Sequence, residues 1–233
     1  MKENTKIDIE EMAKMGVSFG HKFSNLHPKM KPYVSGIKNG VHVIDLEKTA
    51  KELEKALRFV SKTISEGKTI VFVGTKIQIK NLVKLAAEEC GLPYVTERWL
   101  GGTFTNFETI SKRVEYFKDL EKKKSTGELE KYTKKERLKF DKEIESLKVK
   151  FEGIKNMTKN PEAVFILDLK KDDTSAREAK RKGIKIIALC DTNVDPTIAD
   201  YPIPANDDAI SSVNYILEKV KETIINSKPN DIN

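Results

Sequence analysis

The sequence predicts an α/β protein: an open parallel sheet sandwiched by helices, flavodoxin-like or Rossmann-like, with an inserted antiparallel helical hairpin. Two observations carry this prediction. Short apolar, β-branched runs alternate along the chain with longer segments whose apolar residues recur every three or four positions. The segment 107–154 departs from this alternation, because it carries two charged helical patterns with narrow apolar seams.

The amino-terminal part begins with a short helix predicted over residues 7–15, with Thr5 or Asp8 as its cap. Residues 16–40 are dense in Lys, His, Pro and aromatic residues, and we expect them to form a long functional loop. Basic groups interleaved with aromatic rings suit phosphate contact and base stacking, although a solvated loop folded over the sheet would have the same composition.

The α/β pattern proper starts with a strand predicted at 41–45 and a helix at 47–65. A final helix is expected after a cap at Asn206 or Asp207. Right-handed crossovers between such elements place about five strands in one parallel sheet. The remaining predicted strands are 69–73, 94–96, 163–169, 185–189 and 201–204, and the remaining helices are 77–90 and 174–182.

The insertion has two arms separated by the polar stretch 122–127. Apolar residues recur at spacings of three and four in each arm, which predicts an antiparallel hairpin that projects as a contact arm. We therefore expect one α/β domain formed by residues 1–106 and 155–225, the hairpin 107–154, and a disordered polar tail over 226–233.

Composition favours a binding protein over a membrane or secreted one. The net charge is +7 and 34% of residues are charged, which favours a polyanionic partner or simply solubility. The two cysteines, Cys90 and Cys190, form no CxxC pair and suggest no disulfide framework. The chain starts without an apolar signal core, and its apolar runs are of strand length, so we expect a cytoplasmic protein with no membrane partner.

The stretch 98–106 reads Arg-Trp-Leu-Gly-Gly-Thr-Phe-Thr-Asn and lies between the sheet pattern and the arm. Arg98 can neutralise a phosphate, and Trp99 can stack on a base or lock the root of the arm. Gly101 and Gly102 permit a close approach or a positive φ. We expect Trp99, Gly101 and Gly102 to form a structural junction. The candidate residues for contact with a polyanion such as RNA are His21, Lys22, Lys29, Lys31, Arg98, Asn106, Lys112 and Arg113.

An enzymatic alternative rests on aspartates near the predicted carboxyl ends of strands. Asp168, Asp191 and Asp195 could hold Mg²⁺ for a nucleotide- or metal-dependent reaction, but such residues more often close turns. The sequence around Lys76 lacks the spacing of a P-loop, and no GxGxxG occurs. A metal shared by His21, Asp191 and Asp207 is conceivable if the loop folds over the sheet edge. We expect no catalytic residue, cofactor, resident metal or small-molecule substrate.

The stretch 98–106 also resembles the signature of the bacterial-type small-subunit ribosomal protein S-two family. Six further motifs match in order, at residues 19–33, 39–46, 72–76, 90–95, 191–196 and 206–210. The chain departs from the family pattern at Ser18 and at His27, where the family has an asparagine. The resemblance implies a structural component of the small ribosomal subunit that contacts ribosomal RNA and neighbouring ribosomal proteins, and that helps to recruit the mRNA-binding protein S-one.

Overall fold

The central sheet of the computed structural model, which describes residues 7–228, contains five parallel strands in the order β5-β4-β6-β7-β8. Numbered along the chain within this sheet, the order is 2-1-3-4-5, which is the flavodoxin-like arrangement and confirms the predicted fold class. The bounds are β4 (Ile70–Val73), β5 (Tyr94–Val95), β6 (Ala163–Ile166), β7 (Lys185–Cys190) and β8 (Tyr201–Pro204).

Alternate residues of the strands enter two separate apolar cores. Ile70 and Phe72 face the helices α2 (Leu46–Ser65), α3 (Lys80–Glu89) and α7 (Ile210–Ser227). Val71 and Val73 face α6 (Asp173–Lys182) and the segment 99–104. Successive residues of these strands are therefore buried on opposite faces of the sheet. Continuous apolar runs are expected in a parallel sheet that is covered on both faces.

The predicted first strand exists as β3 (Val41–Ile44), but its placement in the parallel sheet is wrong. It pairs antiparallel with β1 (Phe19–Lys22) and β2 (Val34–Lys38) in a separate sheet of order β1-β3-β2. The predicted loop 16–40 is therefore also wrong. Asn39 and Gly40 have φ of 51° and 77° and connect β2 to β3, so an Asn-Gly hairpin signal lay unused in the sequence.

Short helical turns fill the rest of this region. Asp8 caps α1 (Ile9–Lys14), accepting backbone N–H groups of Glu10 and Glu11, while Thr5 lies outside the described residues. The 3-10 turns of this region are η1 (Phe23–Asn25) and η2 (Pro28–Tyr33), and a further turn, η5 (Pro196–Ile198), lies near β8.

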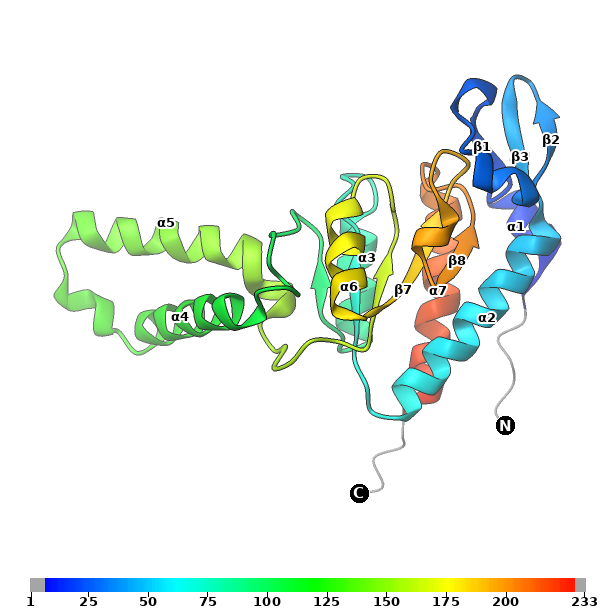
Figure 1. Ribbon diagram of the computed structural model, residues 1–233. Helices are drawn as coiled ribbons and strands as arrows, with labels where there is room; N and C mark the ends of the chain where they lie inside the picture. The colour runs from blue at the N-terminus through cyan, green and yellow to red at the C-terminus, as the bar shows by residue number, and fades with distance from the viewer. Residues whose placement is uncertain (1–6, 229–233) are drawn as a thin grey trace.

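The insertion folds as a helical hairpin that projects away from the sheet, drawn in green in Figure 1. It consists of α4 (Phe107–Ser125), η3 (Glu128–Lys131), α5 (Lys134–Phe151) and η4 (Glu152–Ile154). A capping box between Thr133 and Glu136 starts the second arm. The buried seam of the arms is continuous with the core around Val71 and Val73, so the division into two domains stays a prediction.

The carboxyl-terminal helix is longer than predicted. Asn226 and Ser227 belong to α7, so the expected tail begins too early, and residues 229–233 lie outside the described part of the chain. The expected cap at Asn206 or Asp207 is wrong, because the N-cap residue of α7 is Ala209, which makes no side-chain cap. The Asn206 side chain instead accepts the N–H groups of Asp208 and Ala209 in the turn before the helix. Within residues 7–228, none of the helices combines the length and apolarity needed to cross a lipid bilayer.

Candidate nucleic-acid interface

The segment 98–106 wraps around one buried carboxylate, that of Glu178 on α6. Its Oε1 accepts the N–H of Gly102 at 2.7 Å and the indole N–H of Trp99 at 3.3 Å. Its Oε2 accepts the backbone N–H groups of Phe104 at 3.0 Å and Thr105 at 3.2 Å, together with the Thr105 hydroxyl. Five donors from one loop therefore converge on a side chain that is 6% exposed.

The electrostatics of Glu178 follow from this arrangement. Burial on its own favours the neutral acid, but the backbone N–H groups of Gly102, Phe104 and Thr105 favour the carboxylate more, so the pKa of Glu178 lies below its ordinary value. Glu178 was not predicted from the sequence. The available signal was an acidic residue on the same helical face as the small residues Ser175 and Ala179, both of which are buried.

The inner side of the loop is packed. Trp99 is 7% exposed and meets the Phe104 ring edge to face at 4.7 Å between centroids, so its indole is not displayed for stacking on a base. Gly102 has φ of 95°, which L side chains rarely adopt, whereas a Cβ on Gly101 would meet open space. Of the two glycines, only Gly102 therefore adopts a backbone conformation that favours glycine.

The outer side of the loop carries the exposed Arg98, and the first turns of α4 carry the exposed Lys112 and Arg113 together with two exposed acids, Glu108 and Glu115. Arg98 and Arg113 have no ion-pair partner among the described residues, whereas Lys112 pairs with Glu108 at 2.8 Å. The exposed Asn106 accepts the Thr109 hydroxyl through its side-chain oxygen at 2.9 Å. Two arginines without an ion-pair partner among the described residues, Arg98 and Arg113, thus flank a loop that is held rigid from within.

The candidate residues of the amino-terminal region lie elsewhere. Figure 1 shows β1 at the far side of the molecule from the hairpin, so the structure does not gather the eight candidates into one patch. His21 Nδ1 lies 3.3 Å from Asp191, and Lys29 Nζ lies 2.7 Å from Asp195. These two residues tie the antiparallel sheet to the carboxyl edge of the parallel one, while Lys22 and Lys31 are exposed.

The edge where strand order reverses, between β4 and β6, is occupied by the chain's own side chains. Lys76 Nζ lies 3.4 Å from Asp168, 3.1 Å from Asp207 and 2.6 Å from Asp208. The Thr75 hydroxyl donates to Asp172 at 2.8 Å. In α/β enzymes a ligand binds at this edge. Here a lysine and a threonine fill it with internal ion pairs and hydrogen bonds.

The titration of this cluster reflects burial and crowding of like charges. Burial raises the pKa of Asp207 to about 7, and the carboxylates of Asp168 and Asp191 add to the effect. The pKa of His21 is raised by its hydrogen bond to Asp191, against the effect of burial. Within residues 7–228, no group of three or more His, Cys, Asp or Glu side chains has an arrangement that could hold a metal ion.

Comparison with known proteins agrees with the sequence motifs. Residues 12–227 match the model of the family described as Ribosomal protein S2. The small ribosomal subunit protein uS2 of Coprothermobacter proteolyticus is 40% identical over 222 residues, covering 95% of this chain and 83% of the relative. That of Chlorobium phaeovibrioides is 45% identical over 220 residues, covering 94% and 86%. The protein uS2c of Guillardia theta is 45% identical over 218 residues, covering 94% and 93%.

The family match spans both the sheet and the hairpin, and it includes the loop 98–106 together with its anchor Glu178. The relatives are matched over most of their own length as well, so the likeness is not confined to a shared α/β core. The chain belongs to the ribosomal protein S2 family.

Proposed function

We propose that this chain is a structural constituent of the small ribosomal subunit that contacts ribosomal RNA with the exposed arginines Arg98 and Arg113 at the root of its hairpin. Proteins of this family are structural and non-enzymatic, so the alternative of an enzyme using Asp168, Asp191 and Asp195 is set aside. As part of the ribosome, the protein is expected in the cytoplasm.

The observation that carries the RNA proposal is a single loop, 98–106, whose inner side is held rigid and whose outer side carries an arginine without an ion-pair partner among the described residues. Glu178 and Trp99 fix the backbone of the loop, so little conformational entropy remains to be lost when RNA binds. Arg98 and Arg113 have no partner carboxylate among the described residues, so a phosphate would meet a full positive charge.

The test is competition between wild-type and Arg98→Gln chains for incorporation into small subunits, over a series of salt concentrations. We expect weaker incorporation of Arg98→Gln and an unchanged melting temperature, because Arg98 is exposed and makes no ion pair among the described residues. RNA affinity should lose about one counterion equivalent of salt dependence. Lys14→Gln, an exposed change at the end of α1, is the control. Equal incorporation of both variants at every salt concentration would remove Arg98 from the RNA surface.

A contact with a neighbouring protein, S-one, is proposed for the rim around Lys76. Apolar side chains are exposed there, which favours a protein over RNA: Ile77 is 77% exposed and Ile210 is 51% exposed. Met15 adds to the rim, since the Ser211 hydroxyl next to Ile210 donates to the Met15 carbonyl. Ile77→Ser should weaken capture of purified S-one by the full chain, whereas Leu138→Ser, an exposed apolar change on the hairpin, should not.

A further inference from the structure

A cleft of about 440 Å³ opens between α2 and the start of β8, and nothing in the proposed function uses it. Phe59 and Tyr201 line it, with their rings stacked at 4.3 Å between centroids and 17° between planes. Both rings are half-buried, so the stack has a fixed orientation and still faces the cleft. Its volume is within the range of sites that hold a small organic ligand.

The walls of the cleft are basic. Lys55, Arg58 and Lys62 come from one face of α2, at spacings of three and four, and Lys68 comes from the turn after it. Two acids, Glu66 and Glu162, also line the cleft, so cations outnumber acids four to two among the lining residues, while Glu52 and Glu54 outside the lining pair with Lys55 and Arg58. The cleft therefore combines an aromatic surface with cations on one helix.

Each of the four cations has an acidic neighbour, and Lys55 lies 2.8 Å from Glu52 and Lys68 2.9 Å from Glu66. Arg58 lies 2.6 Å from Glu54, with 68% and 45% of the two side chains exposed, and Lys62 lies 4.0 Å from Glu66. Exposed pairs of this kind contribute little stability, so a phosphate can take over these cations at small cost. Arg58 also offers the planar fork that matches phosphate oxygens.

We propose that this α2–β8 cleft binds a nucleotide of single-stranded RNA, with its base on the Phe59–Tyr201 stack and its phosphate on Arg58 and Lys62. An acidic peptide would bind the cations but leave the aromatic surface uncovered, whereas every nucleobase has a π-face that can stack on it. The inference rests on the proposed function, since ribosomal RNA would supply the strand, but not on the surface around Arg98.

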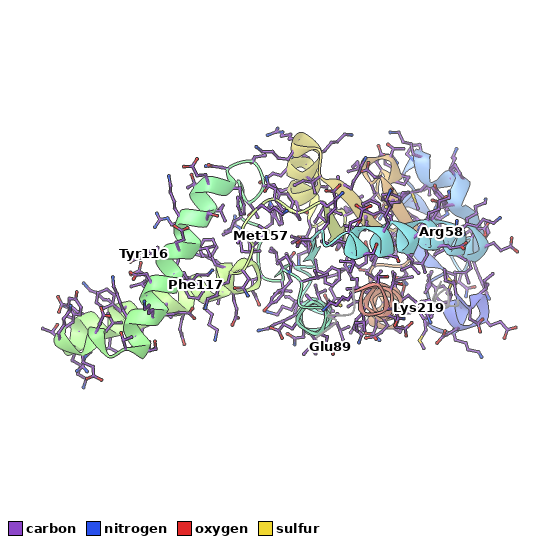
Figure 2. All side chains as sticks on the ribbon, turned by 90° about the horizontal axis from the view of Figure 1, so that it is seen from below. Arg58, Glu89, Tyr116, Phe117, Met157 and Lys219 are labelled. Atoms are coloured by element: carbon purple, nitrogen blue, oxygen red, sulfur yellow. The ribbon has the colours of Figure 1, made fainter. Side chains whose placement is uncertain are left out.

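The position of the cleft makes it a second contact. Figure 2 shows Arg58 on α2, on the opposite side of the sheet domain from the hairpin residues Tyr116 and Phe117. One rigid protein that holds RNA at both places gains affinity from each contact, because the second binding step is intramolecular. The cleft would fasten the sheet domain while the root of the hairpin is fastened separately.

The experiment measures binding of the full chain to a fluorescent oligouridine of about ten nucleotides by anisotropy, over a salt series. Arg58→Gln combined with Lys62→Gln should weaken binding severalfold and reduce the slope of log affinity against log salt by about 0.7, because both cations contact the same phosphate. Tyr201→Leu should weaken binding and leave the slope unchanged. The control removes two charges elsewhere, with Lys14→Gln and Lys84→Gln, and a melt of each variant excludes misfolding.

Ultraviolet cross-linking adds a direct readout, because a uridine stacked in the cleft should cross-link to the peptide that contains Tyr201. Binding by the cleft variants that equals the control, or a cross-link only to other peptides, would overturn the proposal. Displacement of the oligouridine by polyglutamate at equal charge concentration would indicate that the cleft binds an acidic protein instead of RNA. If Arg98→Gln loses binding and the cleft variants do not, the cleft proposal is overturned and the proposed function is kept. If the wild type binds no RNA, both are overturned.

Discussion

At the scale of single residues, the carboxylate of Glu178 holds the loop 98–106 in place. Glu178→Gln keeps the shape but turns amide hydrogens toward N–H donors, leaving buried donors unsatisfied. We expect the free energy of unfolding to fall by about 2–4 kcal/mol, measured by urea denaturation at pH 7. Asp173→Asn, which removes a surface acid of the same helix together with its ion pair to Arg177, should change it by less than about 1 kcal/mol.

The pH dependence of Glu178 gives the same test a second arm. Its pKa in the folded protein lies below the ordinary value, so its stabilising contribution is present at neutral pH and is lost as the pH falls through the acid range. The difference between wild type and Glu178→Gln should therefore shrink from pH 7 toward about pH 3. A difference that stays constant over this range would contradict the depressed pKa.

The two glycines of the loop offer a matched pair. Gly102→Ala places a Cβ at φ of 95° and 3.3 Å from the Cβ of Asn106, and we expect a loss of about 1–3 kcal/mol. Gly101→Ala meets open space and should be neutral or slightly stabilising. Thermal melts report the contrast, since each kcal/mol shifts the midpoint by roughly 2–4 °C for a protein of this size. Equal midpoints for the two variants would show that the loop relaxes around the added methyl group.

At the scale of elements, periodicity predicted what is local and missed what depends on tertiary partners. The helix α2 and the hairpin arms follow from their apolar spacing, and the parallel strands from their β-branched runs. The small sheet was not predicted, because its strands lie among prolines and lysines that are typical of loops. The Asn-Gly turn signal at residues 39 and 40 favoured a hairpin but was given less weight than this composition. Glu178 could not be assigned, since its donors lie more than 70 residues away along the chain.

The departure from the family pattern at His27 has a local explanation. Its Nδ1 accepts the N–H of Lys29 at 3.3 Å and so caps η2, and its backbone N–H donates to the Thr192 carbonyl at 2.8 Å. An asparagine side chain presents an acceptor at a similar distance from its backbone, which is why asparagine is favoured at caps. The histidine thus keeps the capping hydrogen bond that the family residue can make.

The hairpin is the element whose removal tests the domain division. Tyr116 and Glu143 face each other across the arms, with the hydroxyl 3.0 Å from the carboxylate. Joining them through about four glycines and deleting residues 117–142 leaves the root in place, including Gly153, where a Cβ would collide with the Tyr94 carbonyl. We expect cooperative thermal unfolding to persist at a lower midpoint. Loss of cooperativity would mean that the outer seam belongs to the sheet core.

At the scale of the whole molecule, the two sheets meet at the turn after β7. A Cβ on Gly20 would lie 2.5 Å from the Thr192 methyl group, so only glycine lets β1 approach this closely. The His21 backbone N–H donates to the Thr192 hydroxyl at 2.9 Å, and its ring contacts Asp191. The small sheet is therefore held against the carboxyl edge of the large one beside the Lys76 cluster, and the charge state of that cluster bears on how the two parts hold together.

Asp207 makes this dependence measurable. Its pKa is raised to about 7, mainly by burial, whereas in the unfolded chain an aspartate titrates near 3.9. Between about pH 4 and 7 the folded protein holds a proton that the unfolded chain has released, so stability falls as the pH rises. Asp207→Asn removes this group and can still accept from Lys76, so its stability advantage over the wild type should grow by about 2–3 kcal/mol between pH 5 and pH 8. The matched change Asp208→Asn should act in the opposite direction at neutral pH, because Lys76 lowers the pKa of that exposed carboxylate. Urea denaturation from pH 5 to 8 tests both, and parallel profiles for the wild type and Asp207→Asn would show that Asp207 is ionised in the folded protein throughout this range.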